Sequence, residues 1–163
     1  MPEDVGPSTL VGVEPTRTTV DVLLAEARSR IRRLTPEQAF AARAAGAVLV
    51  DTRDSTDRRV EGAIPGAVVV TRNTLEWRAD PTAELPDPVL ADFSNDLIVV
   101  CNDGYASSLA ADTLRRLGHH TAADLIGGYR AWKAAGLPTV IDTGTKAVTG
   151  TDVDVDDLDH GAG

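Results

Sequence analysis

The 163-residue sequence contains a single cysteine, Cys101, and only three histidines. One cysteine excludes an intramolecular disulfide framework and any CxxC metal or thioredoxin-type site. So few thiol and imidazole ligands also argue against a structural zinc cluster, and we expect no metal site. Cys101 is therefore either a small buried apolar residue or a reactive thiol. Taken alone, a free cysteine is more often buried.

The sequence also lacks long apolar runs and an excess of basic charge. No run approaches the roughly 20 apolar residues that are needed to cross a bilayer. Residues 1–9 lack the basic stretch followed by an apolar one that is typical of a secretory signal, so we expect a cytoplasmic protein. The formal net charge is −9. This balance argues against nucleic acid and anionic membranes as partners.

The length suits one compact domain with further segments at both ends. Residues 1–18 contain three prolines and no periodicity, which predicts a flexible arm. The apolar spacing of residues 19–34 predicts a helix laid on the domain surface, with a polar side lined by Arg28, Arg30, Arg32 and Arg33. An anion or partner site at these arginines is the alternative. The domain itself is expected over residues 35–138. Residues 139–163 contain six acids against Lys146 and do not fit a calcium-binding loop, so they predict a solvated acidic tail.

Short apolar runs alternate with helical patterns along the expected domain. Thr35, Pro36 and Gln38 have the spacing of a capping box that starts a helix, and Gly46 ends that helix. The predicted strands are residues 47–51, 68–70, 97–100 and 122–126. The other predicted helices are residues 54–60, 71–79, 89–93, 105–117 and 128–135. This alternation predicts an α/β fold with a parallel sheet flanked by helices on both faces.

Cys101 directly follows the most apolar of these strands, and a loop leads from it into a helix. Ligands bind at the carboxyl ends of the strands in open α/β sheets. The backbone N–H groups of such a loop and the positive end of the helix stabilise a thiolate. Gly104 permits the left-handed backbone that a loop curled around an anion needs. The position therefore favours an exposed nucleophilic thiol over a buried cysteine.

Four ordered motifs resemble those of the rhodanese (sulfurtransferase) family. The motifs are Val48-Leu49-Val50-Asp51-Thr52-Arg53, Gly62-Ala63-Ile64-Pro65-Gly66-Ala67, the run from Leu97 to Gly104, and Leu125-Ile126-Gly127-Gly128-Tyr129-Arg130-Ala131-Trp132 with Gly136-Leu137-Pro138. The resemblance covers about residues 35–138. It implies a single rhodanese-like domain.

The resemblance implies that the Cys101 thiolate takes a sulfane sulfur from thiosulfate or a persulfide. A persulfide on Cys101 would then pass the sulfur to a thiol, to cyanide or to a protein acceptor, without any cofactor. The expected substrate-binding residues are those of the loop and two cations beyond the second strand: Asn102, Asp103, Gly104, Tyr105, Ala106, Ser107, Arg72 and Arg78. Asp51 is expected to order its own loop, and Arg53 to pair with an acid such as Glu61.

The loop carries less positive charge than many active family members, which have Arg or Lys directly after the cysteine and Arg at the fifth position beyond it. Here these positions are Asn102 and Ala106, while Asp103 adds a carboxylate that disfavours both a thiolate and an anionic donor. Two hypotheses follow, an enzyme and a non-catalytic binding module with the same fold. Phosphatase relatives carry Cys-x5-Arg where this sequence has Ser107, so phosphate ester hydrolysis is not expected.

Overall fold

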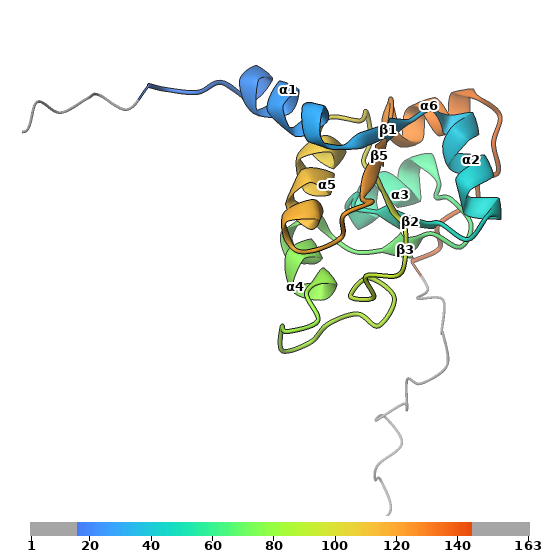
Figure 1. Ribbon diagram of the computed structural model, residues 1–163. Coiled ribbons are helices and arrows are strands. Elements are labelled where there is room, and N and C mark those ends of the chain that lie inside the picture. Colours follow the sequence, from blue (N-terminus) through green and yellow to red (C-terminus); the bar gives the residue numbers. More distant parts are fainter. Residues whose placement is uncertain (1–15, 145–163) are drawn as a thin grey trace, which may run out of the picture.

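The apolar runs that were predicted as strands, joined by the segment Arg32–Leu34, form one parallel sheet in the computed structural model, which describes residues 16–144 (Figure 1). The strands are β1 (Arg32–Leu34), β2 (Val48–Asp51), β3 (Val68–Val69), β4 (Leu97–Val100) and β5 (Ala123–Leu125). Their order in the sheet is β1-β5-β4-β2-β3, and every neighbouring pair is parallel. The predicted arm of residues 1–18, apart from its last three residues, and the predicted acidic tail beyond residue 144 lie outside the described residues.

The helices cover both faces of this sheet, as the alternation predicted (Figure 1). They are α1 (Val20–Arg30), α2 (Pro36–Ala44), α3 (Ser55–Glu61), α4 (Leu75–Ala79), preceded by the 3₁₀ turn η1 (Arg72–Thr74), α5 (Ala106–Arg116) and α6 (Gly128–Ala134). Among the residues that the structure describes, no helix is long and apolar enough to cross a membrane.

The central strand β4 divides the hydrophobic core into two halves. Leu97 and Val99 pack on the face that α4 and α5 cover, and Ile98 and Val100 pack on the face that α2 and α6 cover. All four side chains are at most 1% exposed. A strand buried on both faces needs apolar residues at every position, which explains why this run shows no polar alternation.

The capping box at the start of α2 forms as predicted. The Thr35 hydroxyl accepts a hydrogen bond from the Gln38 N–H at 3.2 Å, and the Gln38 side-chain oxygen accepts one from the Thr35 N–H at 3.0 Å. Pro36 occupies the first turn, where its missing N–H costs nothing. The helix therefore begins at the residue that the sequence indicated.

The predicted single helix over residues 19–34 is wrong in its second part. The helix α1 ends at Arg30, Ile31 is extended, and β1 follows as an edge strand that pairs with β5. Leu34 turns into the core with 8% of its surface exposed. Three residues with one buried side chain carry too little periodicity to distinguish a strand from the end of a helix. The pairing with β5 is a long-range contact that decides the outcome.

The predicted short helix at residues 89–93 does not form. The Asp87 carboxylate accepts hydrogen bonds from the N–H groups of Val89 and Leu90, and the Asp92 carboxylate accepts one from the N–H of Ser94. Aspartate side chains that bind nearby backbone N–H groups stabilise turns in place of helix. The segment is consequently a series of turns.

Candidate functional site

The thiol of Cys101 lies just beyond the end of β4, within the loop that leads into α5. Its Sγ accepts hydrogen bonds from the N–H groups of Gly104 at 3.2 Å and Ser107 at 3.4 Å, and the Ser107 hydroxyl is 3.3 Å away. The expected convergence of loop amides on the sulfur is therefore present for two residues. The expectation of an exposed thiol is wrong, because Cys101 is only 8% exposed. The loop folds over the sulfur and covers it.

The close contact between this loop and the start of α6 requires glycine. Gly104 has a φ of +83°, and a Cβ on it would lie 2.6 Å from the Gly127 nitrogen. A Cβ on Gly128 would lie 2.5 Å from backbone atoms of Cys101 and Asn102. Without these side chains, the first N–H groups of α6 reach the loop carbonyls, with Tyr129 N–H donating to Cys101 at 2.8 Å. The Gly-Gly motif thus allows the cysteine loop and the start of α6 to approach closely enough for hydrogen bonds between their backbones.

A buried carboxylate, that of Asp124 in β5, lies on the inner side of the loop. It is fully buried and accepts hydrogen bonds from the hydroxyls of Ser107 at 3.0 Å and Ser108 at 2.7 Å. Arg33, its direct neighbour in the β1–β5 register, forms an ion pair with it at 2.9 Å. The Ser107 hydroxyl therefore lies between the sulfur and an ion-paired carboxylate. It can accept from a thiol or, by turning, donate to a thiolate.

The carboxylate of Asp103 is paired and lies at the surface. It is 2.7 Å from Arg130 of α6, and Arg130 also pairs with Glu61 at 2.8 Å. These hydrogen bonds to two carboxylates raise the pKa of Arg130, and the bond to Arg130 lowers the pKa of Glu61. The negative charge that Asp103 adds beside the thiol is thus offset by a neighbouring guanidinium.

The other loop residues take different positions. The Asn102 side-chain amide donates to Asp57 at 2.8 Å, which ties the loop to α3. Tyr105 is 61% exposed at the tip of the loop, and Ala106 is the exposed first residue of α5. The loop thus presents a side-chain amide that is bound to α3 and an exposed aromatic ring.

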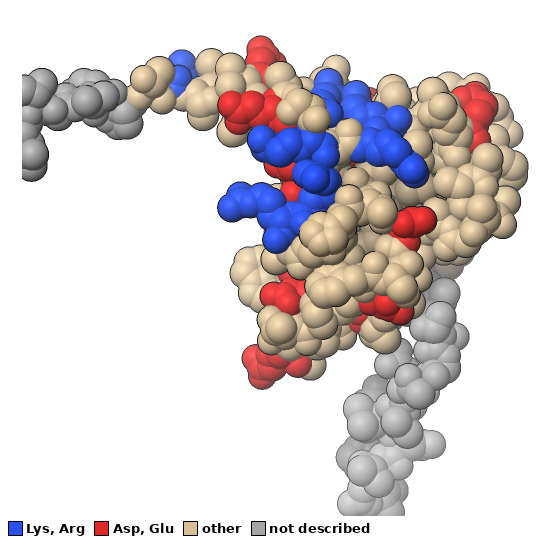
Figure 2. Space-filling model, viewed as in Figure 1, with Lys and Arg blue, Asp and Glu red and all other residues tan. Residues whose placement is uncertain are grey.

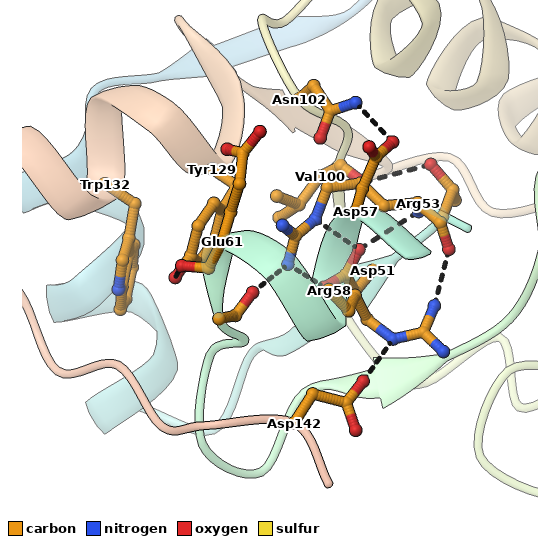
Figure 3. A network of polar contacts seen from close by, with 12 residues as sticks. Asp51, Arg53, Asp57, Arg58, Glu61, Val100, Asn102, Tyr129, Trp132 and Asp142 are labelled. Atoms are coloured by element: carbon orange, nitrogen blue, oxygen red, sulfur yellow. Dashed lines mark hydrogen bonds and ion pairs between the residues drawn. The ribbon is translucent and has the colours of Figure 1, made fainter. Parts of the chain in front are cut away.

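Arg53 and Asp51 form a buried pair behind the loop (Figure 3). The Arg53 guanidinium lies 2.7 Å from the Asp51 carboxylate, donates to the Gly62 carbonyl at 3.0 Å, and stacks over the Tyr129 ring at 3.8 Å. The Arg53 backbone N–H also donates to Asp51. The acid that pairs with Arg53 is therefore Asp51, and not Glu61, which binds Arg130. This pair fixes the turn after β2.

Arg72 and Arg78 bond to residues of their own segment. Arg72 pairs with Glu76, and Arg78 donates to the Leu85 carbonyl at 2.8 Å. Within the described part of the chain, neither guanidinium hydrogen-bonds to the loop of residues 101–107. The structure therefore offers no contact that would make these arginines part of the site.

Besides Arg130, Arg28 of α1 and Arg33 of β1 are cations that reach the loop. Both donate to the Gly104 carbonyl, at 2.9 Å and 3.1 Å. Sequence reasoning placed Arg28 and Arg33 on the polar side of a helix and missed their contact with the cysteine loop, as it missed that of Arg130, because distant segments carry these residues to the site. The one signal available was Asp124, a lone acid in an otherwise apolar strand, which must find a buried partner.

Among residues 16–144, no group of three or more His, Cys, Asp or Glu side chains is placed to hold a metal ion.

Known proteins are similar to this chain over the region that forms the sheet and the cysteine loop. A family model for the rhodanese-like domain matches residues 35–135. A thiosulfate sulfurtransferase GlpE from Haemophilus influenzae is 34% identical over 112 residues, covering 69% of this chain and 95% of the relative. A GlpE from Stutzerimonas stutzeri is 36% identical over 103 residues, covering 63% and 84%.

Solved structures show the same architecture. A Rhodopseudomonas palustris protein, described as being of unknown function and a possible tyrosine phosphatase, matches with a TM-score of 0.71 and 32% identity, covering 83% of this chain and 99% of that one. A polysulfide-sulfur transferase homodimer from Wolinella succinogenes matches with a TM-score of 0.59 and 24% identity, covering 74% and 85%. The second match shows the fold alone. The resemblance stated from the motifs is confirmed, and the chain belongs to the family of rhodanese-like domains.

Proposed function

We propose that this protein is a sulfurtransferase that carries a sulfane sulfur on Cys101. The observation that carries the proposal is the pair of N–H groups, from Gly104 and Ser107, that converge on Sγ at 3.2 and 3.4 Å. Donors fixed in this way stabilise an anionic sulfur without reorganising. Similarity to relatives named thiosulfate sulfurtransferase supports the same activity.

The reaction divides into two displacements at sulfur. In the first, the Cys101 thiolate attacks the outer sulfur of thiosulfate, the S–S bond of the donor breaks, and sulfite leaves with the electron pair. A persulfide donor reacts in the same way and leaves as a thiolate. In the second, an acceptor thiolate or cyanide attacks the outer sulfur of the Cys101 persulfide, and the Cys101 thiolate leaves. No electrons enter or leave the system, so no cofactor is required.

The loop residues have distinct proposed roles in these steps. The amides of Gly104 and Ser107 hold the negative charge on sulfur, and the Ser107 hydroxyl follows the proton state of the thiol by turning between Sγ and Asp124. Asn102, which binds Asp57, and the exposed Tyr105 are the loop side chains proposed to contact the donor. Arg72 and Arg78 have no part in this proposal, since other partners hold them.

The second hypothesis is a binding module that keeps the fold without the chemistry. Two observations favour it, the 8% exposure of Cys101 and the absence of Lys and Arg within residues 101–107. The ion pair of Asp103 with Arg130 speaks against it, because an unpaired carboxylate facing the sulfur would have prevented anion binding. A phosphatase activity is disfavoured, since the position where Cys-x5-Arg enzymes hold phosphate is Ser107, bonded to the Asp124 carboxylate.

The deciding experiment is the detection of a persulfide on the intact chain by mass spectrometry. The protein is incubated in turn with thiosulfate, mercaptopyruvate and cysteine persulfide, and the mass is read with and without a reducing step. Since Cys101 is the only cysteine, added sulfur that reduction removes is located without further mapping. We expect the adduct in the natural chain and its loss in Cys101→Ala. Absence of the adduct with all three donors would overturn the proposal in favour of the binding module.

A further inference from the structure

We propose that Arg28 is a positioning residue of the Cys101 loop, which it holds in place and supplies with positive charge from outside the matched family domain. The inference rests on the proposed function, in that Cys101 is taken as the reactive thiol. Arg28 lies in α1, whereas the family model begins at residue 35. A residue that lies before the matched region therefore contacts the cysteine loop.

A single guanidinium contacts three residues of the loop and of the start of α5. Arg28 donates to the Gly104 carbonyl at 2.9 Å and to the Ser108 hydroxyl at 3.1 Å. Its planar group also lies 5.5 Å from the centre of the Tyr105 ring. Gly104 is the residue whose N–H donates to Sγ, so holding its carbonyl restricts the orientation of that donor. The planar fork of arginine suits such a double contact better than lysine does.

The charge of Arg28 differs from the other charges around the loop because no acid offsets it. Arg130 is paired with Asp103, and Arg33 is paired with Asp124. Among the described residues, Arg28 has no carboxylate within ion-pair distance, and its side chain is half-buried. A half-buried charge is screened less than an exposed one. Arg28 thus places a positive charge without a carboxylate partner beside a loop that contains no Lys or Arg of its own.

The helix that carries Arg28 is fixed at several points. Ala27 is 1% exposed against the domain, and Arg30 pairs with Asp112 in the middle of α5 at 2.7 Å. Arginine side chains gather where α1, β1 and α5 meet, although the chain as a whole is acidic (Figure 2). Arg30 fastens the same helix without touching the cysteine loop. It therefore provides a matched control for Arg28.

The proposal makes the reactivity of Cys101 depend on the charge of the attacking reagent. Iodoacetate is anionic and iodoacetamide is neutral, and both alkylate the same thiolate. Their rate ratio reports the local potential at the sulfur and cancels changes in the amount of thiolate. The only cysteine of the chain is the one probed, so the full-length protein serves without further substitutions.

The experiment measures this ratio at low salt for the natural chain, Arg28→Gln, Arg28→Lys and Arg30→Gln. We expect Arg28→Gln to lower the iodoacetate-to-iodoacetamide ratio about threefold, the size of one partly screened charge near a surface. Arg28→Lys should keep most of the ratio, since the charge remains, but slow both reagents because the fork is lost. Arg30→Gln should leave the ratio unchanged. Added salt should remove most of the difference.

Two results would overturn the proposal. One is an unchanged iodoacetate-to-iodoacetamide ratio in folded Arg28→Gln. The other is an equal fall of this ratio in Arg30→Gln, which would show that Arg28 is only one of several residues that fix α1 to the domain. If Arg28→Gln fails to fold, the salt dependence of the ratio in the natural chain decides, and a ratio that ignores salt overturns the proposal. A lowered ratio without any persulfide from the three donors would reject the sulfurtransferase while the role of Arg28 stands.

Discussion

Arg130 of α6 and Asp103 of the cysteine loop form an ion pair in which the nitrogen and oxygen are 2.7 Å apart. The pair joins the Gly-Gly segment of the family motif to the loop that it supports. It also weakens the main argument that the sequence gives against an anionic donor, because the Asp103 carboxylate beside the thiol is paired with a guanidinium. Both side chains are half-exposed, so the pair affects local charge more than stability.

Removing Arg130 should expose the charge of Asp103. We expect Arg130→Gln to slow persulfide formation from thiosulfate roughly two- to fivefold, the effect of one screened charge on an anion. The double variant with Asp103→Asn should recover most of that rate. Asp103→Asn alone should raise the rate by a similar factor, because it leaves the positive charge of Arg130 beside the loop without the loop carboxylate. Stopped incubations analysed by mass spectrometry give the four rates of this double-mutant cycle.

Glu61 provides the control for this cycle, since it shares Arg130 but lies on α3. Glu61→Gln should leave the thiosulfate rate close to that of the natural chain. If instead Glu61→Gln and Asp103→Asn rescue Arg130→Gln equally well, the effect comes from the general surface charge and not from the carboxylate in the loop.

Gly104→Ala should damage both the fold and the thiol site. The new Cβ would lie 2.6 Å from the Gly127 nitrogen and 3.0 Å from the Leu125 carbonyl oxygen, at a φ of +83° that L residues rarely adopt. We expect a loss of at least about 2 kcal/mol in the free energy of unfolding. The loop should also move, so that alkylation of Cys101 changes in rate. Urea unfolding and the iodoacetamide rate measure the two effects.

Gly46→Ala separates steric crowding from backbone strain. Gly46 has a φ of +107° with nothing within 4 Å of the added Cβ. This substitution should cost about 1 kcal/mol and leave the thiol rate unchanged. Equal losses for the two variants would show that the contact between the loop and α6 does not matter.

The sequence predicted those parts of the fold that depend on local pattern. The runs ending at Asp51 and Val100 are apolar throughout because both of their faces are buried, and the start at Thr35 follows from hydrogen bonds within four residues. The strand β1 escaped prediction because Arg32 and Arg33 give no apolar signal. Its conformation depends on pairing with β5, about ninety residues further on.

The same division applies to the site. Cys101 and its loop were predictable from their place after an apolar strand. The cations around the loop were not, since Arg28, Arg33 and Arg130 approach from α1, β1 and α6. Arg72 and Arg78 lie closer in sequence to the end of a strand, yet nearby acids and carbonyls hold them. The packing of the helices and strands decides which arginine reaches the loop. The spacing of residues along the sequence carries no information about that packing.

Thr35→Ala should weaken the start of α2. The substitution removes the hydroxyl that accepts the Gln38 N–H, while the backbone N–H of residue 35 can still donate to the Gln38 side chain. The expected loss in the free energy of unfolding is about 1 kcal/mol. Thr71→Ala is the control, because Thr71 caps the turn η1 without a side-chain bond to a backbone N–H. A comparable loss at Thr71 would argue against the capping box as the cause.

The ion pair between Arg30 and Asp112 should make the docking of α1 depend on pH. The hydrogen bond from Arg30 lowers the pKa of Asp112 below its ordinary value of 3.8. A carboxyl with a lowered folded-state pKa stabilises the fold above its unfolded pKa, and this stabilisation is lost as the pH falls through the folded pKa.

Asp112→Asn should therefore lower the midpoint of thermal unfolding by about 3 °C at pH 7. Below the folded pKa the two proteins should unfold at nearly the same temperature. Arg30→Gln should reproduce most of this closing gap, since it removes the shorter of the two ion pairs of Asp112, the other being with Arg115 at 3.8 Å. A difference between Asp112→Asn and the natural chain that persists unchanged down to pH values well below 3.8 would assign the loss to packing of the side chain and not to its charge.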